Sequence, residues 1–271
     1  MSQRHERRRT RLPRHFRRLA VLAVSTLLLA ISQLGLAQQE LFDQMADLLD
    51  KGYYNSAARL NGPDLVARFP DDPEAHFLYA RALYLTGDLA GSRTQLDVAM
   101  GLAGEEVPAY SQLGALLVAA EGDPAGALRQ LQNAFLRTRD YKFAMDWGRV
   151  AWQAARYDEA IQAFQAAADT DQGSREPWPY LDLGRVLMLS GRLEEAITAF
   201  NTAIDVYERF DSGAAGPGSP AYVEAYYRLG EVYEMLGQLD RAETHYRAAR
   251  TADPNYGPAV AALDRLSRTF E

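Results

Sequence analysis

Few side chains after residue 37 have the type and spacing that catalysis or metal binding requires. The histidines in this part are His76 and His245, which lie far apart in the sequence, whereas a metal site needs clustered ligands. We expect His76 to pack or to be partly exposed, and His245 to lie on the solvent side of a helix. Adjacent acids such as Glu105-Glu106 and Glu194-Glu195 diverge on a helix, so they make no catalytic carboxylate pair.

Other reactive groups are missing from the composition. There is no cysteine, which excludes disulfides, thiolate ligands and a cysteine nucleophile. The lysines are Lys51 and Lys142, and neither belongs to a phosphate-binding loop motif. The sequence therefore predicts no enzyme, no catalytic residue, no bound metal and no cofactor.

The N-terminal segment has the pattern of an export signal. Arginines crowd residues 4–18 against the single acid Glu6, and residues 19–39 carry no charge. Small residues at Gly35 and Ala37 suit cleavage after Ala37, which completes the pattern of a secretory signal peptide. Residues 1–37 are thus expected to direct the rest of the chain across the inner membrane, to the periplasm or cell envelope. Residues 19–39 could span a bilayer if uncut, so a membrane-anchored form is the alternative.

Removal of this signal changes the charge of the protein. The whole chain has 29 basic and 36 acidic residues, for a net charge of −7. Eight of the arginines and one acid lie in residues 1–37, which leaves 21 basic and 35 acidic residues and a net charge of −14. A chain this acidic is repelled by nucleic acid and by anionic lipid. We therefore expect no nucleic-acid partner, and membrane contact only through an uncleaved segment 19–39.

After the signal, a pattern repeats five times, with starts 35, 33, 36 and 46 residues apart. Each copy has a small residue at a turn, followed by a small residue, a large residue and alanine at i, i+4 and i+7. The third copy, for example, has Ala155 at the turn and then Ala160, Phe164 and Ala167. This spacing gives a helix with one apolar face, and its small residues let a preceding helix approach closely. Leu183-Gly184 and Leu229-Gly230 supply matching small positions on the preceding helices.

These units resemble tetratricopeptide repeats. The fifth copy carries the family pattern most fully, with tyrosine where tryptophan is usual: Tyr226, Leu229, Gly230, Tyr233, Gly237, Ala242, Tyr246, Ala249 and Pro254. The second copy departs from the pattern, because Leu113-Gly114 is one residue out of register with its turn. Five tandem copies at this period are typical of a helical solenoid.

The expected architecture is all-α: one right-handed solenoid of tandem helix-turn-helix (tetratricopeptide) repeats with terminal capping helices. Residues 38–72 are expected to form a degenerate N-terminal helix pair or cap, and residues 73–254 five repeats. Residues 211–220, half of them Gly or Pro, form an insertion loop. Residues 255–271 form a C-terminal capping helix with one apolar face.

The resemblance also implies where a partner would bind, because the first helices of such repeats line a concave groove. Carried over one by one, the groove positions in this sequence are Phe77, Arg81, Tyr84, Lys142, Arg149, Trp152, Trp178, Arg185, Met188 and Tyr227. Arginine recurs at one slot, as Arg81, Arg149 and Arg185. These arginines could pair with carboxylates of a bound segment, with cation–π contacts nearby. Alternatively they pair with neighbouring acids such as Asp146 and Asp182.

The family implies a non-enzymatic scaffold or adaptor in a bacterial cell envelope, binding a partner protein or peptide, with acidic segments if the first interpretation of the arginines holds. Assembly of pili, secretion, outer-membrane or peptidoglycan machinery are the settings it suggests. The alternative is a structural envelope protein that self-associates and has no separate peptide ligand.

Overall fold

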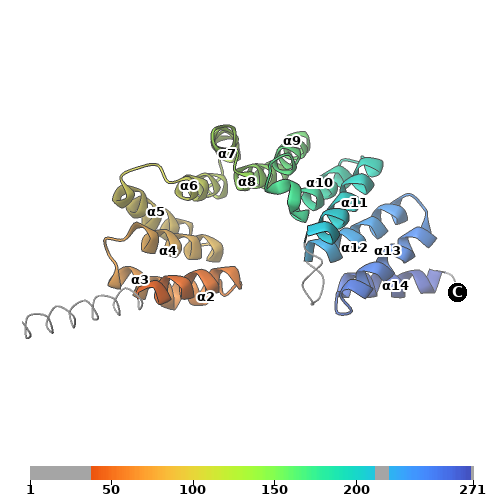
Figure 1. Ribbon diagram of the computed structural model, residues 1–271, viewed down its shortest axis with the longest axis horizontal. Coiled ribbons are helices and arrows are strands. Elements are labelled where there is room, and N and C mark those ends of the chain that lie inside the picture. Colours follow the sequence, from red (N-terminus) through yellow and green to blue (C-terminus); the bar gives the residue numbers. More distant parts are fainter. Residues whose placement is uncertain (1–37, 211–219, 270–271) are drawn as a thin grey trace, which may run out of the picture. The chain divides into compact units, whose positions relative to one another are not determined.

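The computed structural model describes residues 38–210 and 220–269, and within these ranges every regular element is a helix (Figure 1). The predicted signal peptide, residues 211–219 of the insertion and the last two residues lie outside the described residues. Two compact units divide at Glu105/Glu106. No helix of the described ranges is long and apolar enough to cross a membrane.

Unit 1 begins with a helix over residues 38–50 that packs on an interrupted second helix. The second helix consists of α2 (Tyr54–Ser56), a π-helical turn (Ala57–Asn61) and α3 (Gly62–Arg68). A regular pair follows, α4 (Pro73–Thr86) and α5 (Leu89–Ala103). Met45, Leu49 and Leu65 of the first pair join it to α4 in one apolar core.

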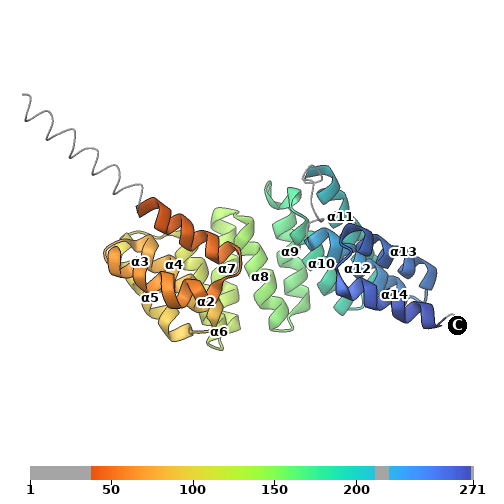
Figure 2. The ribbon, with the colours of Figure 1, turned by 90° about the horizontal axis from the view of Figure 1, so that it is seen from below.

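Unit 2 consists of antiparallel helix pairs that follow one another in chain order (Figures 1 and 2). The pairs are α6 (Pro108–Ala120) with α7 (Pro124–Thr138), α8 (Tyr141–Gln153) with α9 (Tyr157–Ala168), α10 (Pro177–Leu189) with α11 (Leu193–Phe210), and α12 (Pro220–Met235) with α13 (Leu239–Ala252). A short 3-10 helix (Gly173–Arg175) precedes α10. Helix α14 (Gly257–Thr269) follows the last pair, with Leu263 and Leu266 buried against Tyr246.

Each of the last three pairs is held by an aromatic ring against a glycine. A Cβ built on Gly148 would lie 2.5 Å from Phe164, one on Gly184 2.5 Å from Phe200, and one on Gly230 2.4 Å from Tyr246. The three rings are fully buried. The predicted reason for the small residues, close approach of paired helices, is therefore confirmed.

The turn of the third repeat contains an alanine in a conformation that favours glycine. Ala155 has φ +57°. The same turn position in the other repeats is occupied by glycines with positive φ: Gly87, Gly122, Gly191 and Gly237. A Cβ in the left-handed region costs about 1 kcal/mol or more.

We expect Ala155→Gly to raise the free energy of unfolding by about 1 kcal/mol, because glycine adopts this φ without steric cost. Ala154, with φ −81° and ψ 8°, provides the matched control. Ala154→Gly is expected to lower stability, because there is no strain to relieve at a negative φ and glycine increases the conformational entropy of the unfolded chain. Urea unfolding of both variants checks the pair, and a loss of stability in Ala155→Gly would contradict the argument.

Candidate partner-binding cleft

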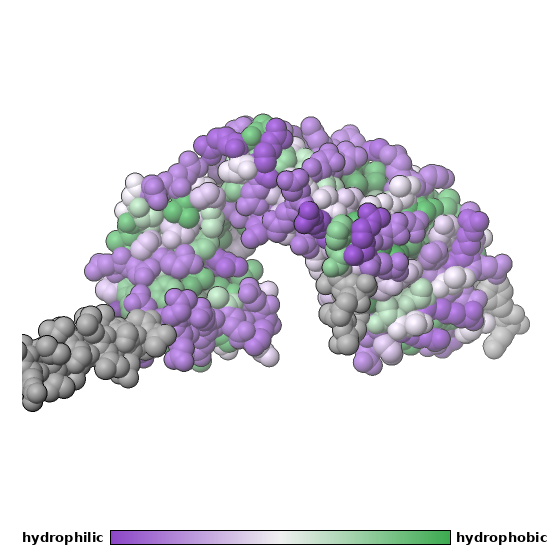
Figure 3. Space-filling view, viewed as in Figure 1, coloured by the Kyte–Doolittle hydropathy of each residue, from purple (hydrophilic) through white to green (hydrophobic). Residues whose placement is uncertain are grey.

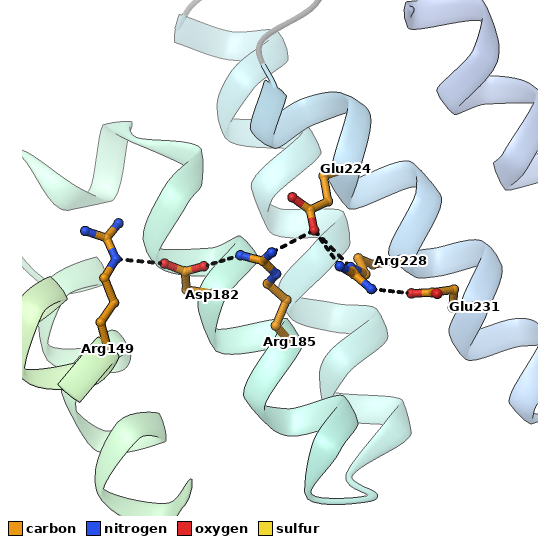
Figure 4. Close-up of polar contacts among 6 residues, drawn as sticks. All are labelled: Arg149, Asp182, Arg185, Glu224, Arg228 and Glu231. Carbon is orange, nitrogen blue, oxygen red and sulfur yellow. Dashed lines mark hydrogen bonds and ion pairs between the residues drawn. The ribbon is translucent and has the colours of Figure 1, made fainter. Parts of the chain in front are cut away.

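The first helices of the last three repeats carry a connected row of charges, which we call the ion-pair ladder: Arg149, Asp182, Arg185, Glu224, Arg228 and Glu231 (Figure 4). Arg185 lies at its centre, with Nη1 2.9 Å from Asp182 Oδ1 and Nη2 2.9 Å from Glu224 Oε1. Arg228 continues it, 2.8 Å from Glu224 and 2.7 Å from Glu231. The ladder therefore links α8, α10 and α12 through side chains.

Arg149 is the loosest member of the ladder. Its Nε lies 3.5 Å from Asp182 and its Nη1 3.6 Å from Asp146, and the side chain is 47% exposed. Asp146 in turn accepts a short hydrogen bond from Gln112 of α6. Burial raises the pKa of Asp146, while the Gln112 bond and the Arg149 charge oppose this rise. Arg149 and Arg185 thus pair with neighbouring acids, which was one of the two interpretations of the sequence.

Beside the ladder is an open cleft of about 410 Å³, which we call the tryptophan cleft, lined by Arg149, Trp152, Gln153, Trp178, Asp182 and Arg185. The Arg185 guanidinium carbon lies 5.4 Å from the centre of the Trp152 ring, a cation–π contact. Trp178 is 36% exposed at the start of α10, whereas Trp147 is buried and donates to Glu159. Four of the predicted groove residues therefore meet in one cleft: Arg149, Trp152, Trp178 and Arg185.

The other predicted residues of unit 2 are more dispersed. Lys142 is exposed near the start of α8, where its backbone N–H donates to Asp140. Met188 lines a second open cleft of about 440 Å³ with Met235 and charged residues of α12 and α14. Tyr227 packs on Tyr246 and Tyr256, and burial, aided by Glu231, raises its pKa to about 12. Tyr227 is thus half-buried among aromatic rings.

In unit 1, the predicted groove residues lie on α4. Phe77 is only 7% exposed, which corrects its prediction as a contact residue. It is buried because α4 is enclosed around most of its circumference: the consecutive residues Ala75, His76 and Leu78 beside it are buried as well. Arg81 and Tyr84 are half-buried, and the Arg81 guanidinium carbon lies 5.9 Å from the Phe77 ring centre.

His76 and His245 are both held by contacts with neighbouring side chains or backbone. His76 is buried, with Nδ1 2.7 Å from Gln95 Oε1 and Nε2 2.9 Å from the Pro70 carbonyl oxygen. His245 is half-buried and stacks on Tyr233, 5.1 Å between ring centres, which corrects its expected place on the solvent side. No group of histidine and carboxylate side chains in the described ranges is arranged to hold a metal.

The environment of His245 predicts a pH dependence of stability. Burial and the nearby Arg241 charge lower its pKa below 6.5, so the folded state binds the proton less readily than the unfolded state. The free energy of unfolding is then expected to fall as the pH drops below about 6.5, by more in the wild type than in His245→Phe. Urea unfolding at several pH values measures the difference, and parallel curves for the two proteins would refute this role of His245.

Two residues of the ladder were missed in the sequence, Glu224 and Arg228. Arg228 lies three residues before the recurring arginine slot, which in the fifth repeat holds Glu231. The available signal was helical spacing, because Arg228 has acids at i−4 and i+3.

The packing of paired helices and the polar row along their first members define a helical-repeat scaffold. Sequence profiles of the tetratricopeptide repeat match residues 47–104 and 114–175, and a second profile of the same repeat matches residues 175–255. The chain therefore belongs to the tetratricopeptide repeat family, whose members are in general non-enzymatic modules that bind protein or peptide partners. The all-helical repeat architecture predicted from the sequence is confirmed.

Solved structures with the same fold share little sequence with this chain. PilW, a type IV pilus biogenesis factor, is 14% identical with a TM-score of 0.62, covering 84% of this chain and 98% of its own. Pseudomonas aeruginosa pilF is 11% identical with a TM-score of 0.55, covering 86% and 97%. BtubC from P. vanneervenii is 15% identical with a TM-score of 0.57, covering 80% and 91%. No curated protein sequence matches the chain.

Proposed function

We propose that this protein is a non-enzymatic adaptor of the bacterial cell envelope that holds a segment of a partner protein in the tryptophan cleft. The observation that carries the proposal is the meeting of Trp152, Trp178 and Arg149 at one open cleft. Tryptophan and arginine are enriched among residues that dominate binding energy at protein interfaces. The envelope location rests on the signal pattern of residues 1–37.

The ion-pair ladder changes the partner chemistry that the arginines first indicated. Three guanidinium groups, on Arg149, Arg185 and Arg228, face carboxylates of their own chain. An acidic partner segment would have to compete with these carboxylates, so charge alone gives it little affinity. We therefore assign the main binding contribution to the aromatic rings.

Capture from an envelope extract tests the adaptor role. The protein is expressed from its full coding sequence, and wild type is compared with Trp152→Ala/Trp178→Ala. We expect the double variant to lose a partner that the wild type retains, with affinity reduced at least about 30-fold. Tyr157→Ala removes an exposed ring on α9, outside the cleft, and serves as the control.

Two further measurements separate the alternatives. Cell fractionation with mass spectrometry of the N-terminus tests export and cleavage after Ala37. Light scattering tests self-association. Equal capture by wild type and the double variant, together with a concentration-dependent mass, would favour the self-associating structural protein.

A further inference from the structure

The tryptophan cleft offers hydrogen-bond donors that have no partner among the described residues. In the part of the chain that the structure describes, neither Trp152 nor Trp178 donates its indole N–H, in contrast to Trp147. The Arg149 guanidinium likewise donates no hydrogen bond there, and its ion pairs with Asp146 and Asp182 are long, at 3.6 and 3.5 Å. These donors need acceptors from any segment that covers the cleft, because buried unpaired donors are costly.

The principal acceptor in the cleft is already occupied. Asp182 is 3% exposed, and both of its oxygens face arginines, Oδ1 toward Arg185 and Oδ2 toward Arg149. An ordinary peptide brings an N–H for every carbonyl. Besides Asp182, the lining offers those N–H groups the side-chain carbonyl of Gln153, whose amide also brings two N–H donors of its own, so donors remain in excess in the cleft. The cleft therefore favours a segment that supplies carbonyl oxygens and few N–H groups.

Charge points to the same kind of segment. The guanidinium groups of the ladder are compensated by Asp182, Glu224 and Glu231, so the cleft has no strong uncompensated charge to match. Figure 3 shows that hydrophilic residues cover much of the visible face of unit 2, with smaller apolar areas between them. An uncharged segment therefore has the smallest desolvation cost on binding to this cleft.

We propose that the tryptophan cleft binds a proline-rich, uncharged segment of the partner in extended polyproline conformation. Proline has a carbonyl but no N–H, and its ring packs on indole faces while the carbonyls accept the indole N–H groups. The polyproline helix is also preformed, so little conformational entropy is lost on binding. A cleft of about 410 Å³ is in the size range that holds a short stretch of such a segment. This inference rests on the proposed adaptor function and names the chemistry of its partner.

Binding of synthetic peptides to the purified full-length protein tests the inference. Decaproline is compared with decaglutamate and with a glycine-serine peptide of equal length, by tryptophan fluorescence and calorimetry. Decaproline is expected to bind most tightly, with an affinity that changes little with salt. Tighter binding of decaglutamate, or equal binding of all three peptides, would overturn the inference.

Conservative variants isolate the indole N–H groups. Trp152→Phe and Trp178→Phe keep an aromatic ring but remove the donor, so each should weaken decaproline binding about three- to tenfold. Tyr157→Phe, which removes a hydroxyl outside the cleft, should leave it unchanged. Unchanged affinity in both tryptophan variants would refute the donor argument.

Failure of the proline-rich inference can be distinguished from failure of the adaptor function. If decaproline does not bind but Trp152→Ala/Trp178→Ala still abolishes capture of the envelope partner, the proline-rich inference is wrong and the adaptor function stands. If decaproline binds and the captured partner's proline-rich segment, made as a peptide, competes with it, both are supported.

Discussion

Gly184→Ala is expected to destabilise unit 2 by about 2–3 kcal/mol, although alanine is the better helix former. The new methyl carbon would lie 2.5 Å from the Phe200 ring, which is fully buried and packed on all sides. Overpacking of this kind typically costs about 1–3 kcal/mol, and more when the neighbour has no room to move. In an open helix the same change would gain about 1 kcal/mol, so the sign of the effect identifies the close approach.

Urea unfolding of unit 2 measures the effect of Gly184→Ala. Gly257→Ala at the start of α14 is the matched control, because no atom lies within 4 Å of its added methyl group. Phe200→Leu in the Gly184→Ala background should recover part of the loss, since the smaller side chain withdraws from the methyl group. Equal stability of Gly184→Ala and wild type would show that the helices separate without cost.

Asp182→Ala is expected to cost about 3 kcal/mol and to loosen the tryptophan cleft. The carboxylate is 3% exposed and balances two guanidinium groups, so its removal leaves partly buried positive charge without a counter-ion. The same variant should weaken partner capture, because Arg149 and Arg185 both line the cleft and lose their fixed orientation.

Thermal and urea unfolding measure the Asp182 effect. Glu195→Ala is the matched control, since Glu195 pairs with Arg192 on an exposed face and its loss should change stability little. The double variant Asp182→Leu/Arg185→Met, which replaces the pair by apolar groups, should be more stable than Asp182→Ala. A double variant as unstable as the single one would contradict the assignment to an uncompensated charge.

The repeat architecture could be predicted from the sequence because its cause is local. A small residue on one helix and an aromatic residue on the next have a fixed spacing around one turn, as Gly184 and Phe200 do. The division at Glu105/Glu106 could not be predicted in this way, and a single array was expected. The division depends on packing between successive repeats, and the repeat spacing does not specify which side chains meet there. The out-of-register Leu113-Gly114 follows this boundary.

The candidate site was only partly predictable. The slot of Arg149 and Arg185 follows from the repeat, and both line the tryptophan cleft. Their partners on the next helix, such as Glu224 for Arg185, depend on side-chain positions between repeats that helical spacing alone does not define. Phe77 lies four residues before Arg81, as Met145 lies before Arg149 and Leu181 before Arg185. All three of these preceding residues are buried, so this position of the repeat belongs to the core and not to the groove surface.

The rarity of lysine gives each unit one natural chemical handle. Lys51 is exposed in unit 1, and Lys142 is exposed on α8 in unit 2. Reagents that attack primary amines would therefore label each unit at a single side chain, besides the N-terminal amine. A fluorophore pair at these lysines would report the spacing of the two units in solution without any engineered cysteine. A photo-cross-linker at Lys142 would record which partner lies near the start of α8.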